Sequence, residues 1–213
     1  MKFEKTEVWG FEHAIRGMRN PLESWKKSDS IILIEQDENN NFREVAKIGK
    51  NDLELMHKLI KAGSEHRKFL RQIFVAVDIT APLYWWKEAD TYKVGTVSNS
   101  TSTMHKLAST PITMDCFEMG DYCGFFETPW KNLIALLEQC RKEYNETKDK
   151  RYWKELIRLL PESWLQKRTI TMNYENLLNM YRSRKNHKLT EWSKSFCDWV
   201  KTLPYAEELI CLE

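Results

Sequence analysis

Alternating apolar and polar positions predict several short strands in this chain. Residues 30–35 (SIILIE) and 42–48 (FREVAKI) carry strand patterns, and the turn-forming stretch QDENNN separates them. We therefore predict a β-hairpin over about residues 30–48. Further strands are predicted near the start of the chain, at 73–79 (IFVAVDI) and at 167–172 (KRTITM).

Apolar residues spaced three and four apart predict helices over much of the remaining chain. Asn51 can cap one helix, and Glu54 three positions later completes a capping-box pattern. The other start signals are Pro82, Thr128-Pro129, Asp149 and Asn173. The stop signals are Gly63, Pro161 and Pro204. The helix after Pro82 should run to about Tyr92, and the hydroxyl-rich residues 94–105 are predicted as a loop.

The order of these elements predicts an α+β fold, with a small central sheet wrapped by helices. We find no internal repeat and no low-complexity linker, so we expect one domain over residues 1–213. Its parts would be the hairpin at about 30–48, the strand, helix and polar loop of residues 73–107, and C-terminal helices over 130–203. A polar loop carried by an apolar scaffold is a common way to present a site.

Composition narrows the class of function. Hydrophobic residues make up 42% of 213 residues, so a sizeable core is available, and the net charge of +2 argues against a dedicated nucleic-acid binder. No apolar run approaches the ~20 residues that cross a membrane, and the first residues lack a signal-peptide core, so we expect a cytoplasmic protein. Five cysteines without a CxxC pair and five scattered histidines predict no metal site.

Two basic segments are candidates for binding anions. Arg16, Arg19, Lys26 and Lys27 surround Trp25, and this segment is either a solvated loop or one that faces phosphate. A second cluster follows the Asn173 helix and consists of Arg182, Arg184, Lys185, His187 and Lys188. It is either a solvated helix end that complements the helix dipole or the source of one arginine that grips an anionic or carbonyl oxygen.

The element order and several residues resemble the flavin-dependent thymidylate synthases, the ThyX family. A strand that ends at Ala81-Pro82 leads into a helix, as in that family. Laid without a gap on the family motif RHRxxSxNExSxRY, the chain has Thr91, Tyr92 and Lys93 at Arg-His-Arg. The motif's serines and final arginine then fall on Thr96, Thr101 and Thr103. Farther along, Leu160-Pro161, Asn173 and Arg184 match the family's spacing.

This resemblance implies a set of roles and ligands. Arg184 would be the catalytic residue and would polarise the pyrimidine ring of a nucleotide of the dUMP type. Tyr92, Lys93 and Asn173 would contact the cofactor FAD, and Thr96, Thr101, Thr103 and Arg184 would contact the substrate. NADPH and methylene-tetrahydrofolate would take part if the family reaction is retained, and the family assembles as a homotetramer.

Two of the motif's three arginines fall on threonine, Thr91 and Thr103, and this replacement removes fixed charges and several donors. Two hypotheses therefore stay open. In the first, the chain binds a nucleotide and flavin and carries out FAD-dependent reductive methylation of a pyrimidine nucleotide. In the second, it is a catalytically inactive ThyX-like interaction or regulatory protein. Lys87, Lys93, Arg16 and Arg19 are the cations that could compensate for the missing arginines.

Overall fold

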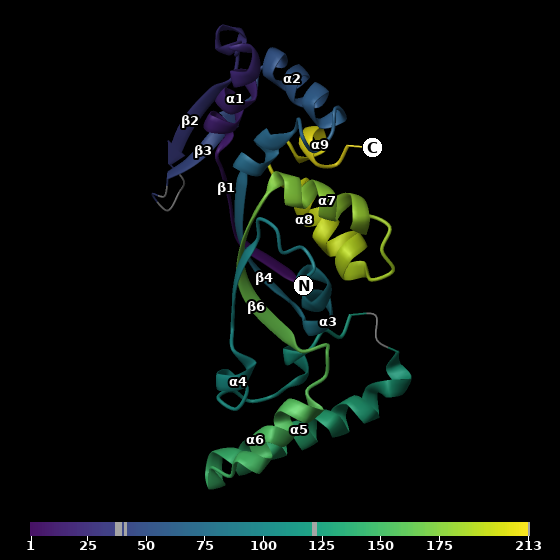
Figure 1. Cartoon of the computed structure of the whole chain (residues 1–213). Coiled ribbons are helices and arrows are strands. Elements are labelled where there is room, and N and C mark those ends of the chain that lie inside the picture. The colour runs from purple at the N-terminus through teal and green to yellow at the C-terminus, as the bar shows by residue number, and fades with distance from the viewer. Residues whose placement is uncertain (37–39, 41, 121–122, 213) are drawn as a thin grey trace. The chain divides into compact units, whose positions relative to one another are not determined.

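We analysed a computed structural model, which describes residues 1–36, 40, 42–120 and 123–212. The fold mixes helices with a small sheet, as the sequence predicts (Figure 1). The strands are β1 (Lys2–Trp9), β2 (Ile31–Gln36), β3 (Phe42–Lys47), β4 (Phe74–Pro82), β5 (Val97–Ser100) and β6 (Leu165–Asn173). The α-helices are α1 (Phe11–Arg19), α2 (Lys50–Lys61), α3 (Leu83–Ala89), α4 (Thr103–Lys106), α5 (Glu127–Thr147), α6 (Lys150–Leu159), α7 (Tyr174–Arg184), α8 (Cys197–Lys201) and α9 (Ala206–Leu209).

Short helical segments of other kinds complete the secondary structure. A π-helix (Glu191–Phe196) runs directly into α8. The 3₁₀ turns are Asn20–Leu22, Trp25–Lys27, Lys68–Gln72, Met114–Cys116 and Gly124–Phe126. No helix within the described ranges is both long and apolar enough to cross a bilayer.

The strands form two sheets. β2 and β3 pair antiparallel, with Ile31 opposite Lys47 and Gln36 opposite Phe42, which confirms the predicted hairpin. The turn expected between them lies largely outside the described residues. The other strands form a four-stranded sheet in the order β1-β4-β6-β5. β4 alternates buried and half-buried positions, because successive strand residues point to opposite faces of a sheet.

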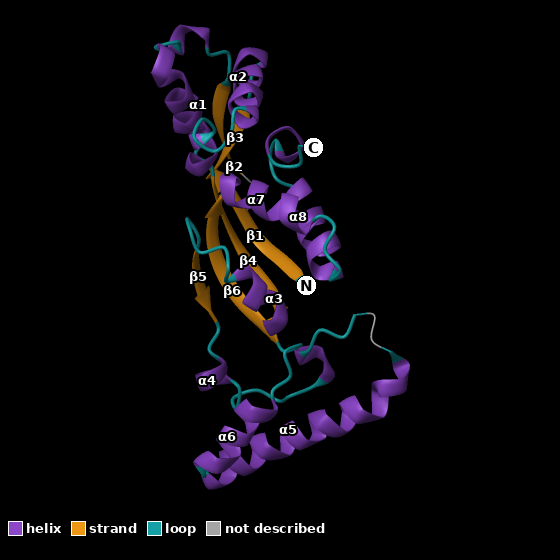
Figure 2. Cartoon of the chain, turned by 45° about the vertical axis from the view of Figure 1, so that its right-hand side comes forward, coloured by secondary structure: helices purple, strands orange, loops and turns teal. Residues whose placement is uncertain are grey.

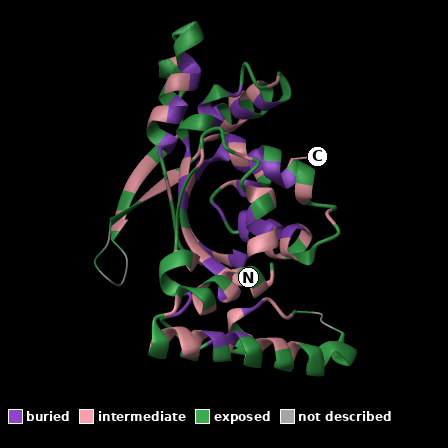
Figure 3. Cartoon of the chain, turned by 60° about the horizontal axis from the view of Figure 1, so that its bottom comes forward, coloured by how far each residue is buried: buried purple, intermediate pink, exposed green. Residues whose placement is uncertain are grey.

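The chain divides into two compact units, and the division passes through all four strands of the larger sheet, β1, β4, β5 and β6. Unit 1 contains residues 1–2, 79–91 and 99–168. Its core gathers Leu107, Ile112, Phe117, Leu137 and Leu156. Helices α5 and α6 lie side by side in this unit (Figure 2). Their buried residues are Leu137, Cys140 and Leu156, and Figure 3 shows most of the rest of their surface as intermediate or exposed.

Unit 2 contains residues 3–78, 92–98 and 169–213. Aromatic rings dominate its core: Phe11 meets Tyr174 edge-on at 5.8 Å between centroids, and Trp192 meets Phe196 at 5.1 Å. The Tyr174 hydroxyl donates to the carbonyl of Pro204 at 2.6 Å, so this buried polar group is satisfied. Much of the aromatic surplus in the sequence is therefore core packing.

Several local predictions are confirmed. The Asp149 side chain accepts from Arg151 N at 2.9 Å and caps α6, which ends before Pro161. Asn173 caps α7. Gly63 follows the end of α2 with φ of 105°, a conformation in which glycine carries little strain.

Other local predictions are wrong, and tertiary contacts explain most of them. Helix α2 begins at Lys50, and Asp29 from another segment accepts from Asn51 N and Asp52 N, so the predicted Asn51 cap does not form. The helix after Pro82 ends at Ala89 rather than at Tyr92. The predicted loop over 94–105 contains β5 and the start of α4. The pattern could not reveal β5, because all four of its residues are exposed and carry no apolar alternation.

Candidate functional site

The candidate site in unit 2 is built around α7 and the turn of residues 92–96. Asn173 and Asn176 form a reciprocal capping box: the Asn173 Oδ1 accepts from Asn176 N at 3.0 Å, and the Asn176 Oδ1 accepts from Asn173 N at 3.1 Å. This box satisfies two backbone donors at the helix start. The Asn176 Nδ2 also donates to the Val94 carbonyl at 2.7 Å, which holds the turn against the start of α7.

Gly95 allows the turn to lie this close. Its φ is +79°, which is in the left-handed region, and an added Cβ would lie 2.9 Å from Asn173 Nδ2 and 3.2 Å from Asn176 Oδ1. A larger residue would therefore be strained and would collide with the capping box. The Thr96 hydroxyl donates to the Tyr92 carbonyl at 2.6 Å and closes the same turn.

Arg184 lies in the last turn of α7 and is half-buried. Its Nε donates to the Tyr92 hydroxyl at 2.9 Å. The guanidinium carbon lies 5.4 Å from the centroid of the Tyr92 ring and 5.2 Å from that of the Trp192 ring. Such contacts stabilise a cation by about 0.5–2 kcal/mol each and restrict its orientation. We call Arg184, Tyr92, Trp192 and the 92–96 turn the Arg184 site.

The structure shows which arginine of the basic cluster at the end of α7 turns inward. Arg184 is the member that is half-buried against two aromatic rings, whereas Arg182 and Lys185 are exposed. Positions two apart on a helix face different directions, which is why only one of the two arginines turns inward.

Among the residues predicted for the site, Tyr92, Lys93, Thr96, Asn173 and Arg184 all belong to unit 2. Lys93 is exposed on the 92–96 turn. The Asn173 oxygen serves the helix cap, and its amide nitrogen is the group that faces the Gly95 turn. The structure thus joins Tyr92 directly to Arg184 and brings Asn173 against the same turn.

Thr101 and Thr103 belong to unit 1. The Thr101 N–H donates to the Lys167 carbonyl at 2.9 Å, and its carbonyl accepts from Gln166 Nε2 at 2.8 Å. Thr103 is the first residue of α4, which Ser102 caps. The backbone of Thr101 is therefore hydrogen-bonded to residues 166 and 167, and Thr103 begins a short helix.

The cations named as substitutes for the missing arginines have different surroundings. Lys87 pairs with Glu162 at 2.7 Å on the surface of unit 1, and the buried Arg19 pairs with Asp52 at 2.6 Å. Arg16 and Lys93 are exposed. Of these, Lys93 is the one that lies on the turn of the Arg184 site.

Sequence reasoning missed two members of this neighbourhood. Trp192 is not among the residues predicted for the site, although its ring contacts the Arg184 guanidinium. Asn176 has a sequence signal, since it stands three positions after the Asn173 cap, where a side chain can reach back to the cap. The described residues contain no group of three or more His, Cys, Asp or Glu placed to hold a metal ion.

Comparison with known proteins supports the fold assignment. No protein-family model matches the chain, and no curated protein matches it by sequence. One solved structure, ThyX from Helicobacter pylori in complex with FAD and dUMP, is similar over 100% of both chains, with a TM-score of 0.71 and 16% identity. A second ThyX structure from Helicobacter pylori, with FAD and dUMP, covers 99% of this chain and 97% of that one, with a TM-score of 0.72 and 17% identity. The chain therefore has the ThyX fold.

Proposed function

We propose that this chain, which has the ThyX fold, binds a pyrimidine nucleotide at the Arg184 site. The observation that carries the proposal is the fixed position of the guanidinium, held by the Tyr92 hydroxyl and by two aromatic rings. A guanidinium is planar and carries five N–H groups, a geometry that matches carbonyl and phosphate oxygens. A donor already fixed in place loses little freedom when a carbonyl or phosphate oxygen arrives.

The roles of the individual residues follow from their chemistry. Arg184 would donate to a pyrimidine carbonyl oxygen and draw electron density from the ring, which favours attack on it. Tyr92 would keep the guanidinium in that orientation. Lys93 would supply a mobile positive charge for phosphate from the same turn. Thr96, Thr101 and Thr103 stay proposed contacts to the substrate.

The donors around the 92–96 turn also suit a flavin. The Asn173 amide nitrogen is not used by the helix cap, and the ammonium of Lys93 and the ring of Tyr92 offer charge and a stacking surface. We propose that Tyr92, Lys93 and Asn173 contact FAD, which when bound would supply hydride chemistry for reductive methylation of the dUMP type. NADPH and methylene-tetrahydrofolate belong to the proposal only with that reaction.

A specific observation favours a second candidate, a binding protein without turnover. The Asn173 oxygen is committed to the capping box, and the Gly95 turn lies against the Asn173 amide nitrogen, so both polar atoms of this side chain already have a neighbour in the protein. In this second candidate the ThyX-like chain keeps a nucleotide site but serves as an interaction or regulatory protein.

The first experiment is a calorimetric titration of the purified protein with dUMP. Arg184→Gln should weaken dUMP binding by about 10- to 100-fold, because loss of a charge-assisted hydrogen bond costs about 1.5–3 kcal/mol. Arg182→Gln, two positions away and exposed, is the matched control and should bind as the parent does. Equal dUMP affinity in the two variants, or no binding by the parent, rejects the nucleotide proposal.

A second experiment separates the two candidates. The protein is incubated with FAD, freed of unbound flavin, and examined for the flavin absorbance band. NADPH oxidation is then followed with dUMP and methylene-tetrahydrofolate present. Retained flavin with dUMP-dependent oxidation supports the enzyme, whereas dUMP binding without flavin or oxidation supports the binding protein.

Three further proposals concern the whole chain. The comparisons cover 99–100% of it, which supports a single ThyX-like domain over residues 1–213. By the family resemblance we propose a homotetramer, which light scattering on the eluted protein tests directly. The five cysteines are all free thiols, which suits a reducing compartment such as the cytoplasm.

A further inference from the structure

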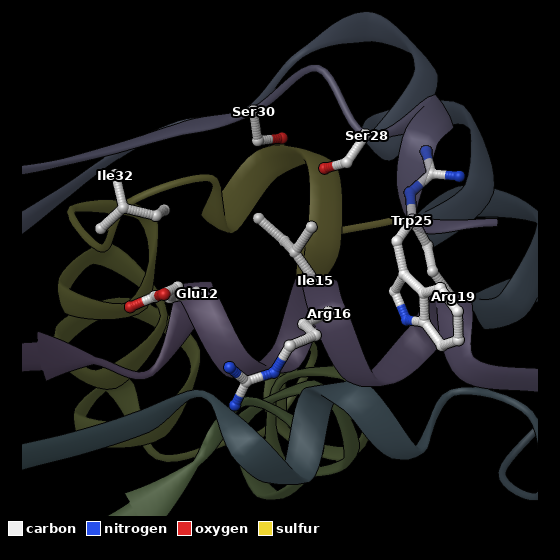
Figure 4. A pocket seen from close by; sticks show the side chains of 8 residues that line it. All are labelled: Glu12, Ile15, Arg16, Arg19, Trp25, Ser28, Ser30 and Ile32. Atoms are coloured by element: carbon white, nitrogen blue, oxygen red, sulfur yellow. The ribbon is translucent and has the colours of Figure 1, made fainter. Parts of the chain in front are cut away.

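Unit 2 contains a pocket of about 190 Å³ that shares no residue with the Arg184 site. It is formed by α1, the segment of residues 25–30 and β2 (Figure 4). Ile15 and Ile32 give it an apolar surface. Its other lining residues are polar, charged or aromatic: Glu12, Arg16, Arg19, Trp25, Ser28 and Ser30.

Trp25 offers a flat surface whose orientation is fixed. Trp25 is 48% exposed, and its indole N–H donates to Asn20 Oδ1 at 2.9 Å. No other aromatic ring stacks on it among the residues that the structure describes. An oriented and accessible indole can stack on a planar ligand with little loss of side-chain entropy.

Two arginines three positions apart on α1 give the pocket a cationic side. The Arg19 side chain is 4% exposed; its Nε donates to Asp52 and its Nη1 to the Ser24 carbonyl. The Arg19 Nη2 is buried and has no hydrogen-bond partner in the described part of the chain. Arg16 is exposed at the pocket and has no ion-pair partner within the same residues. Buried donors are normally paired, so Nη2 marks a place for an acceptor.

The opposite polar side accepts hydrogen bonds. Ser28 and Ser30 both donate their hydroxyl protons to Asp52 Oδ2, at 2.7 and 2.6 Å, and Ser30 Oγ also accepts from Gly49 N at 3.0 Å. Ser28 can therefore act toward a ligand only as an acceptor, and Ser30 keeps one lone pair. Glu12 adds a carboxylate, which disfavours a ligand with more than one negative charge.

Asp52 is hydrogen-bonded to lining residues on both polar sides of the pocket. Its buried carboxylate accepts from Arg19 Nε, Ser28 Oγ, Ser30 Oγ and the backbone N–H groups of residues 29 and 30. One carboxylate therefore joins α1, α2 and the segment that carries Trp25. Because these hydrogen bonds already fix the lining side chains, little conformational entropy is lost when a ligand binds.

We propose that this pocket binds a small planar heteroaromatic monocarboxylate that carries a ring N–H. The ring would stack on Trp25 above the two isoleucines. The carboxylate would accept from Arg16 and Arg19 Nη2, and the ring N–H would donate to a serine hydroxyl or to Glu12. The site is independent of nucleotide binding at Arg184.

The test uses indole-3-carboxylate as the probe and its neutral amide, indole-3-carboxamide, as the matched ligand. Calorimetry measures affinity, and ¹⁵N-labelled tryptophan reports on the Trp25 indole N–H by NMR. We expect saturable binding of the carboxylate with a shift of the Trp25 signal. The carboxamide should bind at least about tenfold more weakly, because it lacks the charge that the arginines recognise.

Variants locate the site on the surface of the folded protein. Arg16→Gln and Trp25→Leu, both at exposed positions, should each weaken carboxylate binding by about tenfold or more. Lys26→Gln, beside Trp25 but outside the lining, and Arg184→Gln should leave it unchanged. No saturable binding up to about 5 mM, which corresponds to a binding free energy of about −3 kcal/mol, overturns the proposal. Equal affinities for the two ligands, or equal binding by Arg16→Gln, Trp25→Leu and the parent, also overturn it.

Discussion

Replacement of Asp52 by alanine should be among the most damaging single substitutions in unit 2. The carboxylate is fully buried, forms a 2.6 Å ion pair with the buried Arg19, and accepts four further hydrogen bonds. Asp52→Ala leaves a buried guanidinium without its counter-charge, which typically costs about 3–5 kcal/mol. At about 2–4 °C per kcal/mol for a chain of this size, the melting temperature should fall by about 6–20 °C.

The same residue should give the stability a defined dependence on pH. Burial pushes the pKa of Asp52 upward, but hydrogen bonds from Ser30, Ser28 and Arg19 outweigh it and hold the pKa below its usual value. The folded protein therefore releases this proton more readily than the unfolded chain. The stabilisation is present above the unfolded pKa of ~3.9 and is lost as the pH falls through the folded value.

Urea unfolding followed by circular dichroism measures both effects. The control is Glu54→Ala on the same helix, whose side chain is 56% exposed and should cost less than about 0.5 kcal/mol. Arg19→Met in the Asp52→Ala background should recover part of the loss, with a coupling of about 1–3 kcal/mol between the two sites. A loss below 1 kcal/mol for Asp52→Ala, or additive effects in the double variant, would refute this reasoning.

Three further outcomes are expected. Gly95→Ala should weaken dUMP binding by about tenfold in calorimetry, since the new Cβ meets the cap of α7. The control is Gly63→Ala, whose backbone is also left-handed but has open space around it, and which should not weaken binding. Equal effects of the two substitutions would contradict this. The hydrogen bond from Arg141 lowers the pKa of Glu138 to about 2, so stability should be lost as the pH falls from 4.5 toward 2, and Glu138→Gln should flatten that part of an acid titration. Burial raises the pKa of Cys197 to about 11, so a thiol reagent at pH ~8 should label it only after unfolding, and rapid native labelling seen by mass spectrometry would show that the site is open.

Local sequence patterns were sufficient for the elements whose signals lie within a few residues. The β2–β3 hairpin, the Asp149 and Asn173 caps, and the helix stop at Gly63 were all predictable, because side-chain alternation, cap chemistry and left-handed glycine act over one turn of chain. The resemblance to ThyX likewise rested on short spacings around Pro82, Asn173 and Arg184, and the fold it implied is the one observed.

Tertiary contacts decided the features that no short window contains. Asp29 displaced the predicted Asn51 cap because it accepts from the first N–H groups of α2 across about twenty residues of sequence. β5 exists because its neighbour in the sheet, β6, pairs its backbone, although none of its side chains is buried. For the site, sequence identified Arg184 as one of several cations, and only the fold brought Tyr92 and Trp192 to its guanidinium. Hydrogen bonds and ring contacts between residues far apart in the chain depend on the path of the backbone, and composition and periodicity do not encode that path.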